Sequence, residues 1–386
     1  MQKEPIFCNF IEEKVLLLKK IVYFCSGIND TAAQEEHYII MDNIRTTDVV
    51  IIGAGPAGSV CGCLLKRAGV DCVVVDRATF PRDKICGGAL SYKAWRLLER
   101  LLPDFGYDYR PVTQLCLQFD DDKPSRVEAE YELRMVRRID FDFSLVRHYQ
   151  EAVGGELLTD AFLGYEELPD GMLAATFRSG LQIRCRYLVA ADGAHSRVRR
   201  QMFGRNPDDF ILYLEQYTEP AEPHEVFAHF SSDYYPGCFY KFPSLGRDIW
   251  GYMGPVTDRQ TFLDLLKRYG VPSGRIVGGY IPMKTFLSPN EHIILIGDAG
   301  GFPNRITGEG LYDAFKTAYN AKTAIVEGRP FSETNREVFD KMRRQDKQLR
   351  FAKTGFGRWF FRWTVGHPRI CKLLYDTKMK RETWIK

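Results

Sequence analysis

The sequence contains no uncharged apolar run long enough to cross a membrane, so we expect no transmembrane helix. The apolar stretch at residues 15–24 is interrupted by Lys19 and Lys20 and follows Glu12 and Glu13, a layout unlike that of a signal peptide. The ten cysteines form no CxxC pair and no zinc-ligand spacing. We therefore expect a cytoplasmic protein with reduced thiols and no metal site.

A large net charge is also missing from the 386-residue chain as a whole, which has 53 Lys and Arg against 50 Asp and Glu. Residues 341–386 differ, because they hold 14 basic and three acidic residues. A near-neutral chain with 45% apolar residues excludes a disordered, collagen-like or coiled-coil protein. At this length we expect two domains or one large intertwined domain.

Residues 1–45 carry no pattern that connects them to the rest of the chain, and we expect them to form an N-terminal extension. Met41 stands a few residues before the first strong strand pattern and is a candidate alternative start. The other interpretation is a helix over residues 11–24 that packs on the protein surface. Both interpretations remain open at this point.

A βαβ pattern begins at residue 47. Residues 48–52 form an apolar run rich in β-branched side chains, as expected for a parallel strand buried on both faces. The glycine-rich sequence GAGPAG at residues 53–58 follows, and then a helical stretch that ends before Gly69. A second buried strand, residues 72–75, closes on Asp76. This pattern predicts one half of a dinucleotide-binding fold.

The spacing of the glycines and of the acidic residue predicts how this half binds its ligand. Gly53 permits a tight turn, Gly55 lets the backbone approach a pyrophosphate, and Gly58 allows close packing of helix and strand. Asp76 ends the second strand, where a carboxylate can accept hydrogen bonds from ribose hydroxyls. We therefore predict a dinucleotide site.

The residues that follow two later strands help to decide whether the dinucleotide is FAD or NAD. Asp192 and Gly193 follow the apolar strand at residues 187–191, and Gly297 and Asp298 follow the strand at residues 292–296. Both pairs lie at carboxyl ends, where open α/β sheets bind their ligands. The alternative role of Asp298 is a helix N-cap.

A second glycine-rich segment, TGEG at residues 307–310, opens a predicted helix over residues 311–327. Glycine amides at a helix start can hold the electron-rich edge of a reduced flavin. Together with the paired Asp and Gly residues, this segment predicts that the dinucleotide is FAD.

The remaining segments are dense in aromatic and turn residues and predict antiparallel sheet. We expect three parts in addition to the N-terminal extension. They are a discontinuous FAD-binding domain (residues 46–110, 140–205 and 286–330), a substrate-binding sheet domain (residues 111–139 and 206–285), and a basic aromatic C-terminal helical region (residues 331–386).

The sequence PRDKICGG at residues 81–88, followed by Leu90 and Ser91, is the most discriminating motif. With the signals above, it resembles the geranylgeranyl reductase family of FAD-dependent oxidoreductases, within the p-hydroxybenzoate hydroxylase superfamily, over about residues 46–330. The resemblance implies an α/β protein with a Rossmann-like FAD-binding fold (glutathione reductase type), an inserted antiparallel-sheet substrate domain and a C-terminal helical region.

The resemblance also implies which residues contact the cofactor. The glycines of the first turn would bind the pyrophosphate, Asp76 the adenosine ribose and Asp298 the ribityl or phosphate portion of FAD. Residues 82–87 would lie near the isoalloxazine and the pyrophosphate, and residues 308–310 against the ring. The full set of expected contacts is Gly53, Gly55, Ala57, Gly58, Asp76, Arg77, Arg82, Lys84, Cys86, Gly87, Asp192, Asp298, Gly308, Glu309 and Gly310.

Two departures from the family pattern affect the substrate more than the flavin. The reductases commonly carry YxWxFP in the substrate sheet, whereas residues 238–243 read CFYKFP here. Arg305 stands where the family often has proline before TGEG. We therefore expect an altered substrate pocket, and a geranylgeranyl chain in particular is not implied.

The motif at residues 81–88 favours hydride transfer from reduced flavin to a carbon–carbon double bond of an apolar, isoprenoid-like substrate. The alternatives are a monooxygenase that hydroxylates an aromatic or lipid substrate through a flavin–oxygen adduct, and a flavin-binding protein without turnover. No second GxGxxG is present, so electrons would come from transiently bound NAD(P)H or from a reduced protein donor.

Cys86 and Tyr240 are the candidate catalytic residues because each could supply a proton at the ring. The alternatives are that Cys86 is a small residue tolerated beside the flavin and that Tyr240 only lines the pocket.

The basic C-terminal segment contains three of the five tryptophans and interleaves aromatic and basic residues. This mixture suits a membrane interface, and it would place the protein peripherally at the inner membrane face through residues 341–386. The alternative is a helical cap with its aromatic side chains turned inward. We expect no nucleic-acid partner, because the rest of the chain supplies no basic face.

Overall fold

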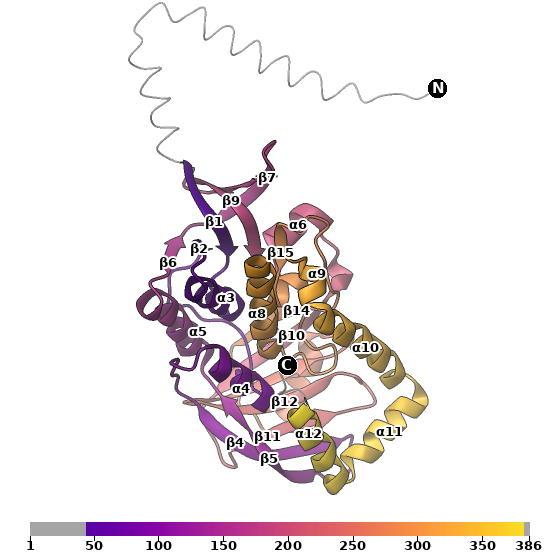
Figure 1. Cartoon of the computed structure of the whole chain (residues 1–386). Coiled ribbons are helices and arrows are strands. Elements are labelled where there is room, and N and C mark those ends of the chain that lie inside the picture. The colour runs from indigo at the N-terminus through magenta and orange to yellow at the C-terminus, as the bar shows by residue number, and fades with distance from the viewer. Residues whose placement is uncertain (1–43, 382–386) are drawn as a thin grey trace, which may run out of the picture.

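The computed structural model describes residues 44–381, which form two sheets with helices packed around and between them (Figure 1). The expected N-terminal extension, its helix at residues 11–24 and the alternative start at Met41 lie outside the described residues, apart from residues 44 and 45, which begin the first strand.

The first sheet has a parallel core built on β1 (Ile44–Ile52). β1 pairs in parallel with β2 (Cys72–Asp76) on one side and with β9 (Gln182–Ala190) on the other, in a register that sets Val50 beside Val73 and Leu188. Its remaining strands are β6 (Glu156–Thr159), β7 (Phe162–Glu167), β8 (Leu173–Phe177) and β15 (Ile293–Leu295). Apolar residues occupy both faces of the core, so the continuous apolar pattern of these strands follows from burial on both faces.

Helices cover this sheet. They are α3 (Pro56–Arg67), α4 (Tyr92–Leu101), α5 (Arg138–Arg147) with a π-helical turn (His148–Ala152), α6 (Arg197–Phe203) and α8 (Leu311–Glu327). α8 has the predicted bounds, and α3 ends where Gly69 adopts a φ of +76°. α3 and α8 lie side by side (Figure 1).

The second sheet is mainly antiparallel, with the strand order β14-β10-β13-β12-β11-β4-β5-β3. Its strands are β3 (Ala89–Leu90), β4 (Arg110–Phe119), β5 (Ser125–Met135), β10 (Phe210–Thr218), β11 (Val226–Phe230), β12 (Cys238–Ser244), β13 (Arg247–Met253) and β14 (Ile276–Pro282). A short turn at Pro207–Asp209 leads into β10.

α7 (Arg259–Arg268) covers one face of this sheet. There Phe262 and Leu266 pack with Phe239 and Tyr252, which alternate along their strands with residues of the opposite face. The opposite face carries Tyr240 and is therefore directed away from α7.

The C-terminal region is helical, as predicted. It consists of α9 (Phe331–Thr334), α10 (Arg336–Ala352), α11 (Gly355–Val365) and α12 (Pro368–Arg381). The described part of the chain has no helix long and apolar enough to cross a membrane.

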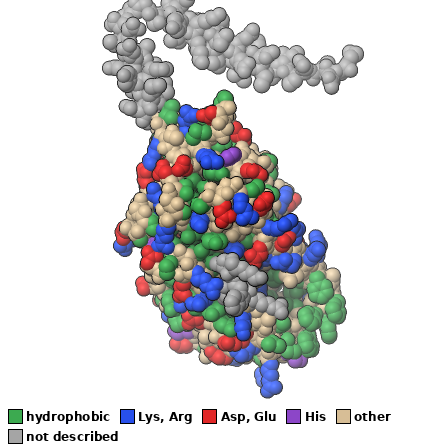
Figure 2. Space-filling view, in the orientation of Figure 1, with side chains coloured by type: hydrophobic (Ala, Val, Ile, Leu, Met, Phe, Trp, Pro, Cys, Tyr) green, Lys and Arg blue, Asp and Glu red, His purple; other side chains and the backbone are tan. Residues whose placement is uncertain are grey.

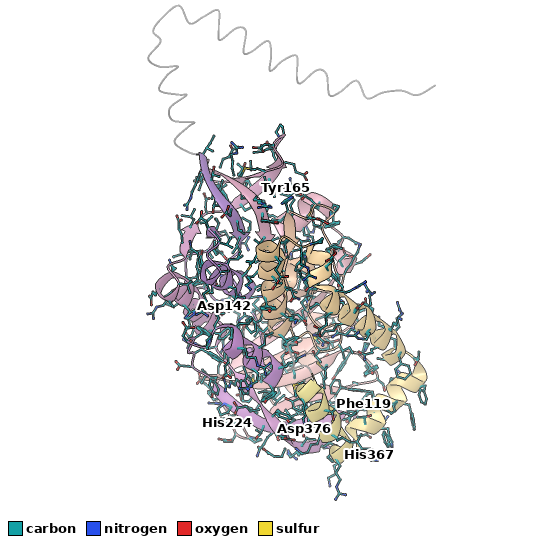
Figure 3. The ribbon with its side chains drawn as sticks, viewed as in Figure 1. Phe119, Asp142, Tyr165, His224, His367 and Asp376 are labelled. Carbon is teal, nitrogen blue, oxygen red and sulfur yellow. The ribbon has the colours of Figure 1, made fainter. Side chains whose placement is uncertain are left out.

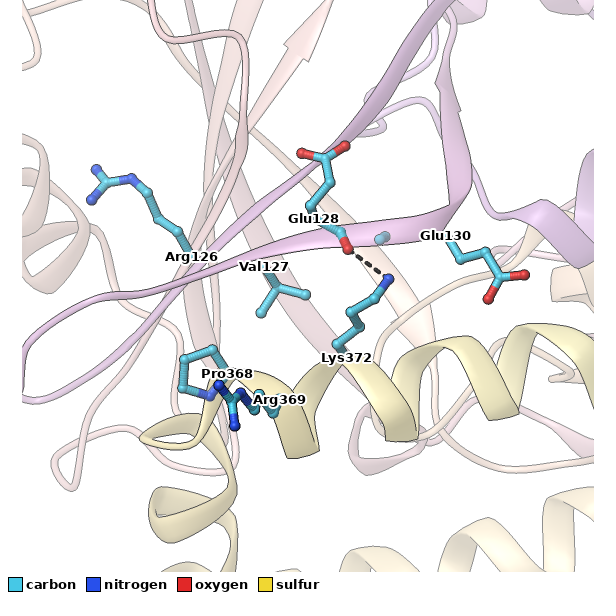
Figure 4. A pocket seen from close by; sticks show the side chains of 8 residues that line it. Arg126, Val127, Glu128, Glu130, Pro368, Arg369 and Lys372 are labelled. Atoms are coloured by element: carbon cyan, nitrogen blue, oxygen red, sulfur yellow. Dashed lines mark hydrogen bonds between the residues drawn. The ribbon is translucent and has the colours of Figure 1, made fainter.

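Ion pairs and hydrogen bonds attach these helices to the body of the protein. The Nζ atom of Lys341 on α10 lies 2.9 Å from a carboxylate oxygen of Asp313 on α8, and Asp313 is almost completely buried. Lys372 on α12 donates a hydrogen bond of 2.8 Å to the carbonyl oxygen of Glu128 on β5. That bond lies at a surface groove of about 530 Å³ between β5 and α12 (Figure 4). Side chains of β5 and α12, the two elements that this hydrogen bond joins, line the groove.

The Lys341–Asp313 pair predicts a strong and specific effect on stability. Replacing Lys341→Met leaves a buried carboxylate without its nearest cation, and we expect the free energy of unfolding to fall by about 3 kcal/mol at neutral pH. The control is Lys347→Met on the same helix, because Lys347 is exposed and has no ion-pair partner in the described chain. Urea unfolding of the two variants measures the difference, and equal losses would contradict the assigned role of the pair.

Candidate functional site

The candidate site lies where the carboxyl ends of β1, β2, β9 and β15 meet the face of the second sheet that is directed away from α7. Parallel strands place the loops after β1, β2, β9 and β15 along one edge of the sheet. The loop at residues 81–88 crosses from this edge to the second sheet. The structure therefore brings together the predicted motifs of four segments that are separated in the sequence, which follow β1, β2, β9 and β15.

The turn after β1 can be made only with glycine at two positions. Gly53 has a φ of +103°, and a Cβ atom on it would lie 2.5 Å from the carbonyl oxygen of Ala191. A Cβ atom on Gly58 would lie 1.8 Å from the carbonyl oxygen of Gly53. The turn delivers the chain into α3 with Gly55 as the N-cap and Pro56 as the first helical residue. The free amides of the first turn of α3, with the positive end of its dipole, therefore face the site.

Arg82 supplies a cation beside these amides. Its Nη2 atom lies 3.5 Å from the position that a Cβ atom on Gly55 would take, and its Nη1 atom lies 3.7 Å from Asp142. Asp142, on α5, is completely buried and accepts hydrogen bonds of 2.8 and 3.0 Å from Arg138 (Figure 3). The loop that carries Arg82 is thus held over α3 by a buried carboxylate.

The acidic residue at the end of β2 faces the glycine turn. One oxygen of Asp76 accepts a hydrogen bond of 2.7 Å from the backbone amide of Ala54, and the other accepts one of 2.8 Å from Ala78. Asp76 therefore shapes the turn even without a ligand. Arg77 is exposed beside it and has no ion-pair partner in the described part of the chain.

Asp192 lies beneath the same turn, because a Cβ atom on Gly53 would approach its Cα atom to 2.9 Å. One carboxylate oxygen accepts a hydrogen bond of 2.7 Å from the amide of Arg197 at the start of α6. The other oxygen is buried and has no hydrogen-bond partner in the described structure. Burial raises the pKa of Asp192, and its hydrogen bonds oppose that shift.

Asp298 connects the loop at residues 81–88 with the start of α8. Its Oδ2 atom lies 3.5 Å from the Nζ atom of Lys84, and its Oδ1 atom lies 3.3 Å from the position of a Cβ atom on Gly310. The residue lies within a short turn (Gly297–Gly300) whose N-cap is Ile296, while Gly310 is the N-cap of α8. No side chain caps either element, so the alternative interpretation of Asp298 as an N-cap is wrong.

The TGEG segment contributes its backbone to the site and its acidic side chain to a buried network. A Cβ atom on Gly308 would lie 3.5 Å from the Sδ atom of Met253 on β13. The Glu309 carboxylate lies 2.9 Å from the Nζ atom of the buried Lys93, and Ser91 also donates to it. Burial alone would raise the pKa of Glu309, but Lys93 and Ser91 outweigh it and lower the pKa. The Glu309 side chain therefore anchors the start of α8.

The loop at residues 81–88 packs tightly against the second sheet. A Cβ atom on Gly87 would lie 2.3 Å from a ring carbon of Phe242, and the Tyr213 hydroxyl donates a hydrogen bond of 2.7 Å to the carbonyl oxygen of Ile85. Cys86 is half-buried, and its thiol accepts a hydrogen bond of 3.5 Å from the amide of Gly88. The Arg138 guanidinium also contacts this thiol.

Glu215 is the most informative residue of the site that the sequence analysis missed. It lies on β10, is completely buried, and accepts hydrogen bonds from the hydroxyls of Tyr240 at 3.0 Å and Tyr217 at 3.3 Å. Burial raises the pKa of Glu215 to about 7, although the two tyrosines and the backbone amide of Cys86 lower it in part. The signal in the sequence was the one charged residue in a strand that is otherwise uncharged and mostly apolar.

Tyr240 lies on the same face of the sheet as Glu215. Its ring centroid is 4.7 Å from that of Phe242, and burial, followed by the charge of Glu215, raises its pKa well above the usual value. The structure thus brings Tyr240 together with Glu215, and the backbone amide of Cys86 also contacts the Glu215 carboxyl group.

The contacts of Arg305 explain why an arginine stands at this position. The side chain is buried and donates hydrogen bonds of 2.9 Å to the carbonyl oxygen of Gly301 and 3.2 Å to that of Pro282. Its Nε atom lies 3.3 Å from Asp346 on α10. Arginine at this position therefore attaches the loop before TGEG to the C-terminal helices.

Comparison with known proteins agrees with this geometry. Residues 46–101 match the model of the FAD binding domain family. A digeranylgeranylglycerophospholipid reductase of Methanopyrus kandleri is 28% identical over 341 residues, which cover 81% of this chain and 85% of the relative. A menaquinone reductase of Mycobacterium tuberculosis is 33% identical over 165 residues, which cover 41% of this chain and 40% of that protein.

The architecture also matches a solved structure. The geranylgeranyl bacteriochlorophyll reductase-like protein of Thermoplasma acidophilum aligns with a TM-score of 0.66 at 19% identity, covering 89% of this chain and 92% of the other. At that identity the likeness shows the fold, and it confirms the predicted combination of an FAD-binding sheet, an antiparallel substrate sheet and C-terminal helices. The chain is an FAD-dependent oxidoreductase whose residues 46–101 match the FAD binding domain model, and geranylgeranyl reductases are among its distant homologues.

Proposed function

We propose that this protein reduces carbon–carbon double bonds of an apolar, isoprenoid-like substrate. The observation that supports it most is the packing of the loop at residues 81–88 against a sheet face that carries Tyr213, Tyr240, Phe242 and Met253. An apolar chain enters such a face at little desolvation cost, and the buried Glu215 and Tyr240 supply proton chemistry within it. The relatives named as reductases of a geranylgeranyl lipid and of menaquinone support the same substrate class.

The residues around the turn after β1 would hold FAD. The amides at the start of α3, with Gly55, Ala57 and Arg82, suit the pyrophosphate, because they combine free donors, a helix dipole and a cation. Asp76 keeps lone pairs available for a ribose, and the unpartnered oxygen of Asp192 is a further acceptor.

The remaining predicted contacts would lie along the flavin. Lys84 and Asp298 suit its ribityl and phosphate portion, and the start of α8 suits the electron-rich edge of the ring. Arg77, which is exposed and has no ion-pair partner among residues 44–381, would reach the adenosine end.

Reduction of a double bond needs a hydride at one carbon and a proton at the other. Bound FAD, reduced by NAD(P)H or by a protein donor, supplies the hydride. Tyr240 would give its hydroxyl proton to the second carbon, and Glu215, hydrogen-bonded to that hydroxyl, would return a proton to it. Cys86 would contact the reacting groups beside the ring without giving up a proton.

The cofactor site predicts that Gly55→Asp abolishes FAD binding without unfolding the protein. Gly55 has a φ of −69° at a helix N-cap, a conformation that aspartate favours, but the new carboxylate would occupy the position of the pyrophosphate. The control is Gly106→Asp, because no atom lies within 4 Å of the Cβ position on Gly106. Flavin absorbance per protein is measured beside thermal unfolding. Stoichiometric FAD in Gly55→Asp would refute the pyrophosphate placement.

The proposed reaction predicts that a substrate reoxidises the flavin in the absence of oxygen. The FAD-loaded protein is reduced anaerobically and mixed with a digeranylgeranyl phospholipid or with menaquinone, and flavin absorbance and product mass are followed. A reductase returns the oxidised spectrum without oxygen and adds two hydrogen atoms to each reacting double bond. A monooxygenase reoxidises only after air is admitted and adds an oxygen atom, which would refute the proposed reduction.

The proton pathway predicts that turnover depends on pH, with one descending limb in the pH–rate profile. Because Glu215 has a pKa raised to about 7, turnover should fall as the pH rises through that value, where Glu215 loses its proton. Glu215→Gln should remove this limb, and Tyr240→Phe should lower kcat by roughly 100-fold while leaving the reduction of FAD by its donor unchanged.

The control for the proton pathway is Tyr252→Phe on the opposite face of the sheet, which should keep wild-type turnover. Cys86→Ala should keep the pH limb. Unchanged turnover in Tyr240→Phe would remove that tyrosine from the reaction.

A further inference from the structure

The two faces of α11 differ sharply. The inner face is attached to the second sheet, where the ring centroid of Phe361 lies 4.8 Å from that of Phe230. Arg362 donates hydrogen bonds of 2.7 and 2.8 Å to the two carboxylate oxygens of Asp122, next to β4. Thr354 caps the helix through the amide of Gly357. The helix is therefore held in one orientation.

The outer face of α11 carries an exposed aromatic stripe, spaced three or four residues apart so that its members share one side of the helix. The exposed fractions are 64% for Phe356, 57% for Trp359, 42% for Phe360 and 39% for Trp363. The rings stack in pairs, with centroids 5.6 Å apart for Phe356 and Trp359 and 6.1 Å apart for Phe360 and Trp363. Figure 2 shows an apolar surface over α11, and Figure 3 labels His367 just beyond its end. Phe361 turns inward, as a helical cap would require, whereas the stripe faces outward.

Unpaired cations lie on α11 and in the segments that flank it, among the residues that the structure describes. Arg350, Lys353, Arg358 and Arg369 are exposed, and none has an ion-pair partner in the described chain. The acidic residues of the C-terminal helices are already engaged, since Asp346 contacts Arg305 and Asp376 contacts Lys372. Arg350 and Lys353 at the end of α10 and Arg369 at the start of α12 therefore flank the aromatic stripe along the chain with uncompensated positive charge.

We propose that the aromatic stripe of α11 docks on the surface of a membrane that contains anionic lipids. Aromatic rings enter the headgroup region while nearby Arg and Lys side chains contact lipid phosphates, so one orientation satisfies both groups. A second copy of this chain fits less well, because a symmetric contact through the stripe would oppose the same four unpaired cations. This surface does not depend on the reaction proposed above.

The stripe is rigidly connected to the FAD-binding loops. α10 precedes α11 and is held by the Lys341 contact with Asp313 and by the Arg305 contact with Asp346. Arg305 itself bonds to the loop that leads into TGEG. Docking through α11 would therefore orient the candidate site at a defined height above the lipid.

Flotation of the full-length, FAD-loaded protein with lipid vesicles tests the proposal. We expect binding to vesicles of phosphatidylcholine with phosphatidylglycerol, weaker binding to phosphatidylcholine alone, and a loss of binding as salt rises. The double variant Trp359→Ser with Trp363→Ser should weaken binding at least roughly tenfold. Replacing Arg350, Lys353 and Arg358 with glutamine should abolish the preference for anionic lipid.

The matched control replaces exposed apolar side chains elsewhere, Leu163→Ser with Val256→Ser, and should bind as the wild type does. FAD content and thermal unfolding verify that each variant is folded. Quenching of wild-type tryptophan fluorescence by brominated phospholipid gives an independent measure. The proposal is overturned if the wild type does not bind anionic vesicles, if the tryptophan variant binds equally well, or if the stripe instead supports a concentration-dependent dimer.

Discussion

The contact between Gly87 and Phe242 holds the two halves of the molecule together at the candidate site. A single added carbon on Gly87 would lie 2.3 Å from the Phe242 ring, so the loop and the second sheet can meet only through glycine. The same loop places Arg82 over the start of α3 and Cys86 beside Arg138. The loop that carries Arg82 and Cys86 therefore meets the substrate sheet through one close approach of backbone to an aromatic ring.

Buried charge organises the rest of the site. Asp142 is paired with Arg138 on its own helix and lies 3.7 Å from Arg82 of the loop at residues 81–88. Glu309 and Asp313 are held by Lys93 and Lys341 from neighbouring helices. Glu215 differs, because its hydrogen-bond partners are tyrosine hydroxyls and burial, only partly offset by them and by the charge of Arg247, raises its pKa to about 7. A carboxyl group with a pKa near neutral can both bind and release a proton, whereas the ion-paired carboxylates are suited to fix geometry.

Local patterns predicted much of the fold. The strands β1 and β2 were recognisable because a buried parallel strand is apolar on both faces. The helix α8 was recognisable because apolar residues recur along it at helical spacing. Gly53 and Gly58 were recognisable because the turn itself requires a positive φ at Gly53 and leaves no room for a Cβ atom at Gly58. Glu215 was not recognised, because its importance comes from Tyr240 and the amide of Cys86, which other segments of the chain supply.

The sequence by itself determined the βαβ unit, the glycine turn, the FAD motifs and the cationic aromatic character of the C-terminal segment, since each depends on residues close together in the chain. Only the tertiary structure decided which aromatic side chains of α11 face the protein and which face outward, and why Arg305 replaces a proline. It also decided that a lone glutamate in a strand lies beside the loop at residues 81–88. The physical reason is that burial, pairing of charges and the pKa of a carboxyl group are set by neighbours in space.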